Sequence, residues 1–355
     1  MITLDDIRLA QQRLAGVAIH TPLIPCPRAA SPDSPSLWFK PESLQPMGAF
    51  KLRGAYNKIA SLSDLERGRG VITYSSGNHA QGVAYAAKLL GVKAVVVMPG
   101  SAPRTKIEST AAYGAEIVPV GPSSLERQRK AEELAREHGY VIVPPFDDEQ
   151  IIAGQGTAGL EILADMPTVG CVLVPVGGGG LLSGIATAVK LINPEIKVIG
   201  VEPELAADAQ ASFRSGHIVE YTGEQTARTL ADGLRTQRLG ILTFEHIRRY
   251  VDDILTVSEA EIREAVRRLA LKAKLIAEPS GAVPFAAFLF HGKQLPRVER
   301  TVAVISGGNV APELLANLLC EEPATATTQT TVTARQSSAV GRSIPESGST
   351  ERNWK

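Results

Sequence analysis

One lysine, Lys51, stands in a setting that favours covalent chemistry. It follows Phe50 in the segment ESLQPMGAFKLRGAYN (residues 42–57), where a moderately apolar run predicts a helix that continues to Ala60. A cation in the first turn of a helix is unfavourable, because the helix dipole attracts anions there. A lysine desolvated between Phe50 and a helix start would have a lowered pKa, and its neutral amine would be the nucleophile that Schiff-base chemistry requires. The alternative is a solvated surface lysine, which is the usual state of this residue type.

Two later segments contain residues that suit anion binding. YSSGNHAQG (74–82) follows a strand-like run and opens a predicted helix, so its hydroxyl and backbone N–H groups predict a carboxylate site. PVGGGGLLSG (175–184) follows the strand ending at Val176, and its glycines allow backbone amides to surround a phosphate. An ordinary Ser-rich helix cap would account for the first segment only in part, because it leaves Asn78 and His79 unexplained. Glycine-rich turns alone are a weak signal.

The glycine spacing leaves a different kind of cofactor open. Gly178, Gly180 and Gly184 approximate a dinucleotide fingerprint with one extra residue, and Glu202 follows about twenty residues later at the end of the next predicted strand. No Gly-Lys-Ser/Thr follows the glycines, so the segment is not a Walker loop. An NAD-dependent dehydrogenase is therefore the alternative from a different functional class.

The elements that must position these residues form two regular series. The first series predicts strands at 71–73, 94–98, 116–120 and 140–143, with helices at 78–90, 103–113 and 124–138. The second predicts strands at 171–176, 197–202, 253–257 and 301–305, with helices at 181–192 and 258–275. Such alternation predicts an α/β protein with two open, mostly parallel twisted sheets and helices on both faces. Ligands bind such sheets beyond the carboxyl ends of the strands, where both candidate segments fall.

A further strand at 36–40 leads into the lysine segment. We therefore expect residues 1–61 and 148–321 to form the larger domain and residues 62–147 to form the smaller one. The predicted helix at 258–275 opens with Ser258 and Glu261, which have the spacing of a capping box.

Composition excludes several classes of function. The 355 residues suit two packed domains, and 44% hydrophobic residues describe a soluble globular protein. Lys plus Arg and Asp plus Glu both number 37, so net charge favours neither nucleic acid nor an anionic membrane. Cys26, Cys171 and Cys320 are distant and odd in number, which argues against a disulfide framework or a metal cluster. We expect a cytoplasmic protein.

The two ends of the chain differ in character. Residues 1–16 predict a helix with Asp5 as its N-cap, and they lack the basic start and continuous apolar run of a signal peptide. No run of about eighteen apolar residues, as a membrane-spanning helix needs, occurs anywhere. From Glu322 onward the sequence is rich in Thr, Ser and Ala and has few large apolar residues, so we expect a disordered tail.

Four motifs in this order resemble the fold type II pyridoxal phosphate enzymes, specifically the threonine dehydratase and serine racemase family. They are the Lys51 segment, SSGNH (75–79), GGGGL (177–181) and ISGGN (305–309). The resemblance extends from about Ile7 to about Leu319, nearly the whole chain. It implies a fold like that of the tryptophan synthase β subunit, pyridoxal 5′-phosphate as cofactor, a small amino acid as substrate, and a homo-oligomer that is a dimer or larger.

The resemblance also implies roles for individual residues. Lys51 would hold the cofactor covalently with Phe50 beside it, Asn78 would hydrogen-bond the ring hydroxyl, and Ser306 would meet the pyridine nitrogen. The residues implied for the cofactor phosphate are Gly177, Gly178, Gly179, Gly180 and Leu181. Those implied for the substrate carboxylate are Ser75, Ser76, Gly77, Asn78 and His79. A neutral hydroxyl beside the pyridine nitrogen does not keep that nitrogen protonated. The cofactor ring is then a weaker electron sink, which favours rapid β-elimination.

Two further roles follow from the same resemblance. In serine racemases the serine that matches Ser76 is the acid/base on the face of Cα opposite the lysine. Glu202, Ala206 and Asp208 match the spacing of the family's divalent cation site, with Ala206 contributing its carbonyl, and such oxygen ligands suit Mg or Ca. The alternative for these residues is a solvated helix start with acidic side chains near its dipole.

The sequence departs from the family before the lysine. The family usually reads Thr-Gly-Ser-Phe-Lys, whereas residues 47–51 read MGAFK, which leaves the substrate preference open. PPFDDEQIIAGQGT (144–157) is more similar to the dehydratases than to the animal racemases. The resemblance thus implies an ammonia-lyase (dehydratase) that converts L-threonine, L-serine or a related β-hydroxy amino acid, such as 3-hydroxyaspartate or phenylserine, to a 2-oxo acid and ammonia. A serine or hydroxyaspartate racemase is the alternative.

Overall fold

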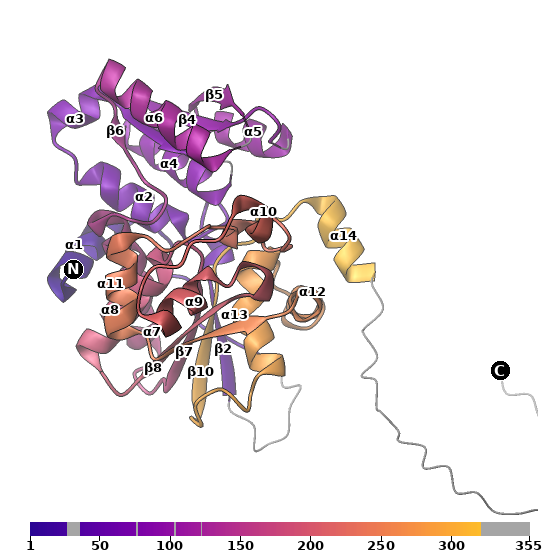
Figure 1. Ribbon diagram of the computed structural model, residues 1–355. Helices are drawn as coiled ribbons and strands as arrows, with labels where there is room; N and C mark the ends of the chain where they lie inside the picture. Colours follow the sequence, from indigo (N-terminus) through magenta and orange to yellow (C-terminus); the bar gives the residue numbers. More distant parts are fainter. Residues whose placement is uncertain (27–35, 76, 103, 122, 321–355) are drawn as a thin grey trace, which may run out of the picture. The chain divides into compact units, whose positions relative to one another are not determined.

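Two sheets and their covering helices make up the part of the chain that the computed structural model describes (Figure 1). The described residues are 1–26, 36–75, 77–102, 104–121 and 123–320. Ser76, which the resemblance implies as an acid/base, and the segment from Glu322, which the composition predicts to be disordered, lie outside them.

The larger sheet has six strands in the order β1-β2-β10-β7-β8-β9. Their bounds are β1 Ile24–Pro25, β2 Ser36–Pro41, β7 Cys171–Pro175, β8 Lys197–Pro203, β9 Asp253–Val257 and β10 Arg300–Ile305. β1 is antiparallel to β2, and the other neighbouring strands of this sheet are parallel. β2 pairs with β10 along its whole length, from Ser36 opposite Arg300 to Pro41 opposite Ile305. The strand that leads to Lys51 therefore lies beside the strand that leads to Ser306.

Side chains of the larger sheet alternate between two apolar clusters, one on each face. Along β10, Ala303 and Ile305 pack on the side of α12 and α13, whereas Val302 and Val304 pack on the side of α7 and α8. The bounds of these helices are α7 Glu149–Asp165, α8 Gly180–Ile192, α12 Glu259–Arg268 and α13 Pro279–Phe290. Figure 1 shows the two pairs on either side of the strands. Because both faces are covered, the strands are continuous apolar runs.

The remaining elements of this part connect or cover the sheet. They are α1 Leu4–Leu14, η1 Glu42–Leu44, η2 Glu204–Ala206, α9 Asp208–Ser215, α10 Gly223–Thr226, η3 Asp232–Leu234, α11 Ile241–Tyr250 and α14 Pro312–Cys320. Among the described helices, none has both the length and the apolar character that crossing a membrane demands.

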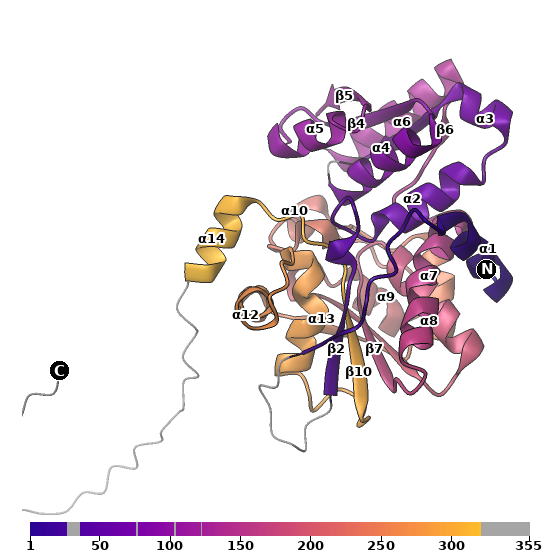
Figure 2. The same cartoon turned by 180° about the vertical axis from the view of Figure 1, so that it is seen from behind.

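The smaller sheet has four parallel strands in the order β5-β4-β3-β6. Its elements are α3 Asp64–Arg69, β3 Val71–Tyr74, α4 Asn78–Leu90, β4 Ala94–Pro99, α5 Arg104–Ala111, β5 Glu116–Val120, α6 Ser124–His138 and β6 Val141–Ile142. Apolar side chains of α4 pack on one face and those of α6 on the other. Figures 1 and 2 show these two helices beside the strands of the smaller sheet. The predicted fold class of two open, mostly parallel sheets is confirmed. Both sheets belong to one compact unit, Met1–Glu321, and we propose that residues 62–147 form its smaller domain.

The N-cap of α1 differs from the prediction. The cap is Thr3 and not Asp5: Thr3 Oγ1 accepts from the N–H of Asp6, and the Asp6 carboxylate accepts from the N–H of Thr3. This reciprocal pair satisfies two N–H groups at the helix start, whereas a cap at Asp5 would satisfy fewer and shorten the helix.

The helix predicted at 258–275 is also shorter than expected. The capping box of Ser258 and Glu261 is confirmed, but α12 ends at Arg268. A π-helical turn, Leu269–Ala273, follows and stops at Lys274, whose φ of 59° is left-handed. The apolar pattern continues through this turn, so the sequence predicted one uninterrupted helix.

Candidate functional site

Lys51 is the first residue of α2 (Lys51–Ala60), and its amine is held beside an aromatic ring and a carbonyl. Nζ lies 5.2 Å from the centroid of the Phe50 ring and donates to the Pro145 carbonyl oxygen at 2.6 Å. The Phe50 N–H donates to the Ser306 carbonyl oxygen at 3.0 Å. Burial lowers the pKa of Lys51 to about 8, as the sequence led us to expect. The surface alternative for this lysine does not hold.

The N-terminus of α4 is where a substrate carboxylate is predicted. Gly77 is the N-cap, and its N–H donates to Ser75 Oγ at 3.3 Å. The N–H groups of Asn78 and His79 open the helix and have no acceptor within it. They present the positive end of the helix dipole, which suits a bound carboxylate.

The His79 imidazole is neutral and already engaged. Its Nε2 lies 2.9 Å from the Val143 carbonyl oxygen, and burial together with the charge of Lys51 lowers the pKa of His79 to about 3. A carbonyl oxygen can only accept, so Nε2 carries the proton and Nδ1 is an acceptor. The side chain cannot donate to a carboxylate in this state. The binding role predicted for His79 is therefore left to its backbone N–H.

Asn78 is fixed by two residues that the sequence analysis did not select. Its Nδ2 donates to Glu278 Oε1 at 2.6 Å, and its Oδ1 accepts from Asn309 Nδ2 at 2.8 Å. Asn309 Nδ2 also donates to the Met47 carbonyl oxygen at 3.0 Å. Burial, and secondarily the charge of Asp232, raises the pKa of Glu278 to about 8. Glu278 precedes Pro279 at the start of α13, and no periodic pattern distinguishes it from a surface acid.

The glycine segment connects β7 to α8. Gly179 is the N-cap of α8 with a φ of 96°, a left-handed conformation that favours glycine. A Cβ on Gly178 would lie 2.2 Å from the Phe146 ring, and one on Gly180 would lie 3.1 Å from the Phe146 Cβ. These glycines are thus required by the close packing of Phe146 as well as by the turn. The first N–H groups of α8, including that of Leu181, lack helical acceptors and suit a phosphate dianion.

Ser306 follows β10 and joins the lysine segment through the backbone. Ala49 and Gly307 form an isolated antiparallel bridge beside the Phe50–Ser306 hydrogen bond. The Ser306 side chain is buried, and no hydrogen bond of its hydroxyl to another described residue is found. A neutral hydroxyl is therefore available in this part of the site.

The segment PPFDD (144–148) links these parts. Pro145 accepts from Lys51, and Phe146 packs on the glycine segment. The Asp147 carboxylate accepts from the first N–H groups of α11, and Asp148 caps α7. These contacts bring the lysine and glycine segments together. Ser306 joins the lysine segment through the Phe50 N–H, and Asn78 joins it through Asn309. The similarity of this segment to the dehydratases does not by itself predict these structural roles.

Glu202 and Asp208 meet at the N-terminus of α9. The Glu202 carboxylate accepts from the N–H groups of Ala209 at 3.2 Å and Gln210 at 2.6 Å. Asp208 is 1% exposed, and its Oδ2 has no hydrogen-bond partner among the described residues. Burial and the neighbouring Asp208 raise the pKa of Glu202 well above its usual value, and burial raises the pKa of Asp208 to about 7.

These two buried carboxyls fit a divalent cation better than a solvated helix start. An unpartnered carboxylate oxygen beside a second carboxylate is a set of hard ligands, and Ala206 is buried in the preceding η2 turn. Within the described ranges, no group of three or more His, Cys, Asp and Glu side chains gathers so that it could hold a metal ion. Backbone carbonyls would have to complete the coordination.

Comparison with known proteins shows the family to which the chain belongs. A family model described as "Pyridoxal-phosphate dependent enzyme" matches residues 15–307. The chain belongs to this family. L-threonine ammonia-lyase from Thermotoga maritima is 44% identical over 319 residues, which are 90% of this chain and 78% of that protein. L-threo-3-hydroxyaspartate ammonia-lyase from Saccharomyces cerevisiae is 43% identical over 318 residues, 89% of this chain and 96% of that protein. The solved structure of maize serine racemase has a TM-score of 0.84 at 38% identity and covers 89% of this chain and 96% of that one.

Membership of the pyridoxal-phosphate family confirms the predicted cofactor class and makes the dehydrogenase alternative wrong. The structure gives another reason for the glycines and the glutamate that approximate a dinucleotide fingerprint. A Cβ on Gly184 would lie 2.4 Å from the Ile152 carbonyl oxygen, so this glycine serves the close contact of α8 with α7. Glu202 accepts from the backbone of α9 and is not directed to a ribose.

The polar groups of the site also fit pyridoxal phosphate, independently of the comparisons with known proteins. It combines a lysine amine of lowered pKa, the free N–H groups at the start of α8 for a phosphate, and a neutral Ser306 hydroxyl. These groups match an aldehyde, a phosphate and a pyridine nitrogen respectively.

Proposed function

We propose that this protein is a pyridoxal phosphate-dependent ammonia-lyase that dehydrates L-threonine, L-serine or a related β-hydroxy amino acid to a 2-oxo acid and ammonia. The observation that carries the proposal is the Lys51 amine, whose pKa is lowered to about 8 and which lies against PPFDD beside the glycine segment. The similarity to two ammonia-lyases over about nine-tenths of the chain supports the reaction type.

The proposed cofactor contacts follow the predicted residues. Lys51 would hold the cofactor covalently with Phe50 beside it, Asn78 would face the ring hydroxyl, and Ser306 would face the pyridine nitrogen. The phosphate would bind to the backbone of Gly177, Gly178, Gly179, Gly180 and Leu181. When bound, pyridoxal phosphate supplies an electron sink for the negative charge that develops at the substrate Cα.

The chain itself would position the substrate and move its proton. The α4 N-terminus, from Ser75 to His79, would bind the carboxylate and so orient Cα. An amine with a pKa of about 8 is partly neutral near neutral pH, so Lys51 Nζ can accept the Cα proton. Elimination needs this one base: Cα loses its proton to Lys51 Nζ, the bond between Cβ and the hydroxyl oxygen breaks, and the hydroxyl takes up a proton and leaves as water. Ser306 offers a hydrogen bond without holding a positive charge, which limits the lifetime of charge at Cα and favours loss of the hydroxyl over reprotonation.

We propose in addition that Glu202, Asp208 and the Ala206 carbonyl bind Mg or Ca. The support is the buried, unpartnered Asp208 Oδ2 beside a second buried carboxyl. This cation would stabilise the start of α9, because the Glu202 carboxylate already accepts from the N–H groups of Ala209 and Gln210 there.

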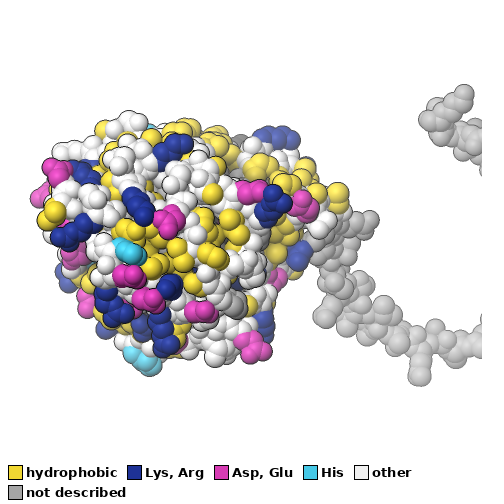
Figure 3. Space-filling view, turned by 90° about the horizontal axis from the view of Figure 1, so that it is seen from above, with side chains coloured by type: hydrophobic (Ala, Val, Ile, Leu, Met, Phe, Trp, Pro, Cys, Tyr) yellow, Lys and Arg dark blue, Asp and Glu magenta, His cyan; other side chains and the backbone are white. Residues whose placement is uncertain are grey.

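We also propose a cytoplasmic homo-oligomer, a dimer or larger, without a nucleic-acid or membrane partner. The balanced charge supports the absence of polyanionic partners. Leu44 and Ile276 are nearly half exposed and belong to segments that both approach Gly308, and exposed apolar groups support self-association. Figure 3 shows how apolar side chains gather between charged ones on one face.

One experiment tests the reaction. The purified protein is incubated with L-threonine, L-serine, L-threo-3-hydroxyaspartate and phenylserine, and each reaction is followed by a 2-oxo acid assay and by chiral chromatography. We expect 2-oxo acid as the main product and the D-isomer as a minor one. D-serine forming faster than pyruvate would identify a racemase, and no product from any of the four would reject the lyase.

A further inference from the structure

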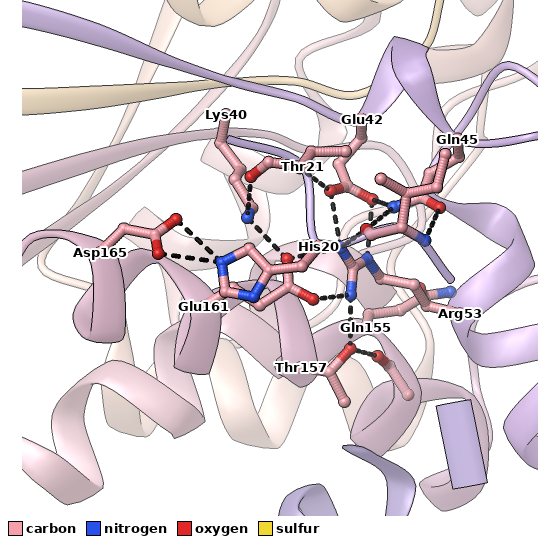
Figure 4. Close-up of polar contacts among 12 residues, drawn as sticks. His20, Thr21, Lys40, Glu42, Gln45, Arg53, Gln155, Thr157, Glu161 and Asp165 are labelled. Carbon is pink, nitrogen blue, oxygen red and sulfur yellow. Dashed lines mark hydrogen bonds and ion pairs between the residues drawn. The ribbon is translucent and has the colours of Figure 1, made fainter. Parts of the chain in front are cut away.

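Arg53, two residues after Lys51, lies at the centre of a buried cluster of four charged side chains, which we call the Arg53 cluster. Its members are Lys40, Glu42, Arg53 and Glu161. They come from β2, η1, α2 and α7 and meet in the interior (Figure 4). Lys40 and Glu42 are 0% exposed, Arg53 is 1% and Glu161 is 7%. The mechanism proposed above uses none of them.

The Arg53 guanidinium makes two forked contacts. Nε and Nη2 donate to the two oxygens of Glu42 at 2.7 and 2.9 Å. Nη1 and Nη2 donate to the two oxygens of Glu161 at 2.7 and 2.8 Å. Its remaining donor capacity is used by Thr157 Oγ1 at 3.1 Å and the Ile19 carbonyl oxygen at 3.2 Å. A planar fork held by two carboxylates has only one orientation.

The other charges are satisfied equally fully. Lys40 Nζ pairs with Glu161 Oε2 at 2.6 Å and donates to the Thr21 carbonyl oxygen at 2.6 Å. Glu42 accepts further bonds from Thr21 Oγ1 and Gln45 Nε2. Burial alone would raise the pKa of Glu42, but Arg53 outweighs it and holds that pKa below its usual range. Two positive and two negative groups therefore balance.

Stability does not explain this arrangement. Replacing a buried ion pair by well-packed apolar side chains of similar volume is often neutral or stabilising, because the charges lose their hydration on burial. A forked ion network provides a fixed direction instead.

The element that takes its direction from this network is the first turn of α2. The second half of α2 is held by its own side chains, because Asn57 Nδ2 donates to the Gln150 carbonyl oxygen at 2.7 Å and Lys58 pairs with Asp148 at 2.6 Å.

The first turn has close contacts that do not fix a direction in the same way. A Cβ on Gly82 of α4 would lie 3.2 Å from the Lys51 carbonyl oxygen, and one on Gly54 would lie 2.9 Å from the Ile151 carbonyl oxygen of α7. The N-cap residue Phe50 makes no side-chain cap hydrogen bond. Backbone contacts of this kind allow a helix to turn or slide, whereas a forked side chain does not.

We propose that Arg53, held by Glu42 and Glu161, is a positioning residue that sets the rotation of the first turn of α2 and thereby keeps Lys51 Nζ against Pro145 and away from water. Arg53 and Lys51 share one helical turn, so a rotation that moves one moves the other. The Arg53 N–H also donates to the Phe50 carbonyl oxygen at 3.0 Å, which ties the turn together. This inference rests on the role proposed for Lys51.

The test compares two cluster variants with two controls. Arg53→Met combined with Glu42→Gln removes the forks but leaves Lys40 opposite Glu161, so the buried charge stays balanced. Arg53→Lys keeps the charge without the fork and decides the question if the double variant does not fold. Lys58→Met removes a cation of the same helix that pairs with Asp148 at 2.6 Å. Ile254→Ala, in the core beside β8, lowers stability without touching the cluster.

The first readout is the pKa of the Lys51 amine, measured on the full-length protein after removal of the cofactor. Trace acetylation at a series of pH values is quantified by mass spectrometry of the Lys51 peptide. We expect a pKa near 8 in the unaltered protein and in both controls. In the cluster variants it should rise by about one unit or more toward the ordinary value, because the amine becomes hydrated. An unchanged value in the folded cluster variants would overturn the proposal.

The second readout separates kcat from KM on the best substrate. A displacement of about 1 Å from the reacting geometry can lower the rate by about 100-fold, so kcat should fall on that order while KM changes by about threefold or less. A kcat equal to that of Ile254→Ala would show that Arg53 is merely structural. Borohydride reduction of the unaltered protein, followed by peptide mass analysis, tests the Lys51 role separately. Cofactor mass absent from Lys51 would reject the proposed function while leaving the acetylation result interpretable.

Discussion

Without divalent cations, the stability of this protein should fall as pH rises through the titration of Asp208. Its pKa is raised to about 7 in the folded protein from an ordinary 3.8. A carboxyl with a raised folded pKa contributes stability that is fully present below the unfolded pKa and is lost as pH rises through the folded pKa. The loss occurs between the ordinary pKa of 3.8 and the folded pKa of about 7. A titration from pH 5 to 8 crosses about two pH units of this interval, which corresponds to a loss of about 3 kcal/mol in the free energy of unfolding.

The assay is thermal unfolding in a chelator at pH values from 5 to 8, with Asp208→Asn as the control. For a chain of this size about 1 kcal/mol moves Tm by about 2 °C. The Tm of the unaltered protein should therefore fall by about 6 °C more than that of Asp208→Asn over this range. The reason is that titration of Asp208 lowers the free energy of unfolding by about 3 kcal/mol, whereas asparagine does not titrate. Glu202, whose pKa is also raised, remains in both proteins and extends the fall to higher pH.

Adding Mg or Ca gives the second half of the test. A cation that binds only the folded state stabilises it by mass action, by about 2.7 kcal/mol at 100 times its Kd. Protons compete for the same oxygens, so Tm should rise more at pH 8 than at pH 5 and should not rise in Asp208→Asn. Equal pH dependence of the two chelated proteins would refute the raised pKa of Asp208, and an equal rise of both proteins with cation would refute the cation site.

Three further outcomes are expected. Lys51→Ala should abolish 2-oxo acid release, and residual turnover above background in the product assay would contradict its role. Ser306→Asp should still bind the cofactor but release 2-oxo acid about tenfold more slowly, equivalent to about 1.4 kcal/mol, and an unchanged kcat would place Ser306 away from the pyridine nitrogen. Gly178→Ala should lose about 1–3 kcal/mol in urea unfolding because its methyl group would overlap Phe146, whereas Gly68→Ala, which faces open space, should not; equal midpoints would disprove the overlap.

The fold was predictable because its pattern is local and repeated. Strands covered on both faces are apolar throughout, so β4 and β7 stand out in the sequence without any knowledge of their neighbours. The loops after such strands lie at one edge of a sheet, which is why the glycine segment could be assigned to a ligand. Lys51 was recognisable because a cation at a helix start conflicts with the dipole.

The residues that complete the site carry no such pattern. Glu278 and Asn309 are single polar residues, and nothing local shows that they meet Asn78 from 200 and 231 positions away. The Arg53 cluster was missed for a related reason: charged residues are exposed by default, and only their partners make burial possible. The π-turn after α12 leaves the apolar pattern intact, so periodicity could not reveal it.

The pairing of β2 with β10 has a consequence for the order of folding. The smaller sheet is built from one continuous stretch, so its strands can pair as soon as they have left the ribosome. The larger sheet cannot close until β10 has been made, and Asn309 reaches Met47 across 262 positions. Closing so long a loop is slow and entropically costly. Until β10 has been made, the nascent chain displays Lys51 on an unfinished surface, so we expect the cofactor to be acquired only after the segment with Ser306 and Asn309 has been synthesised.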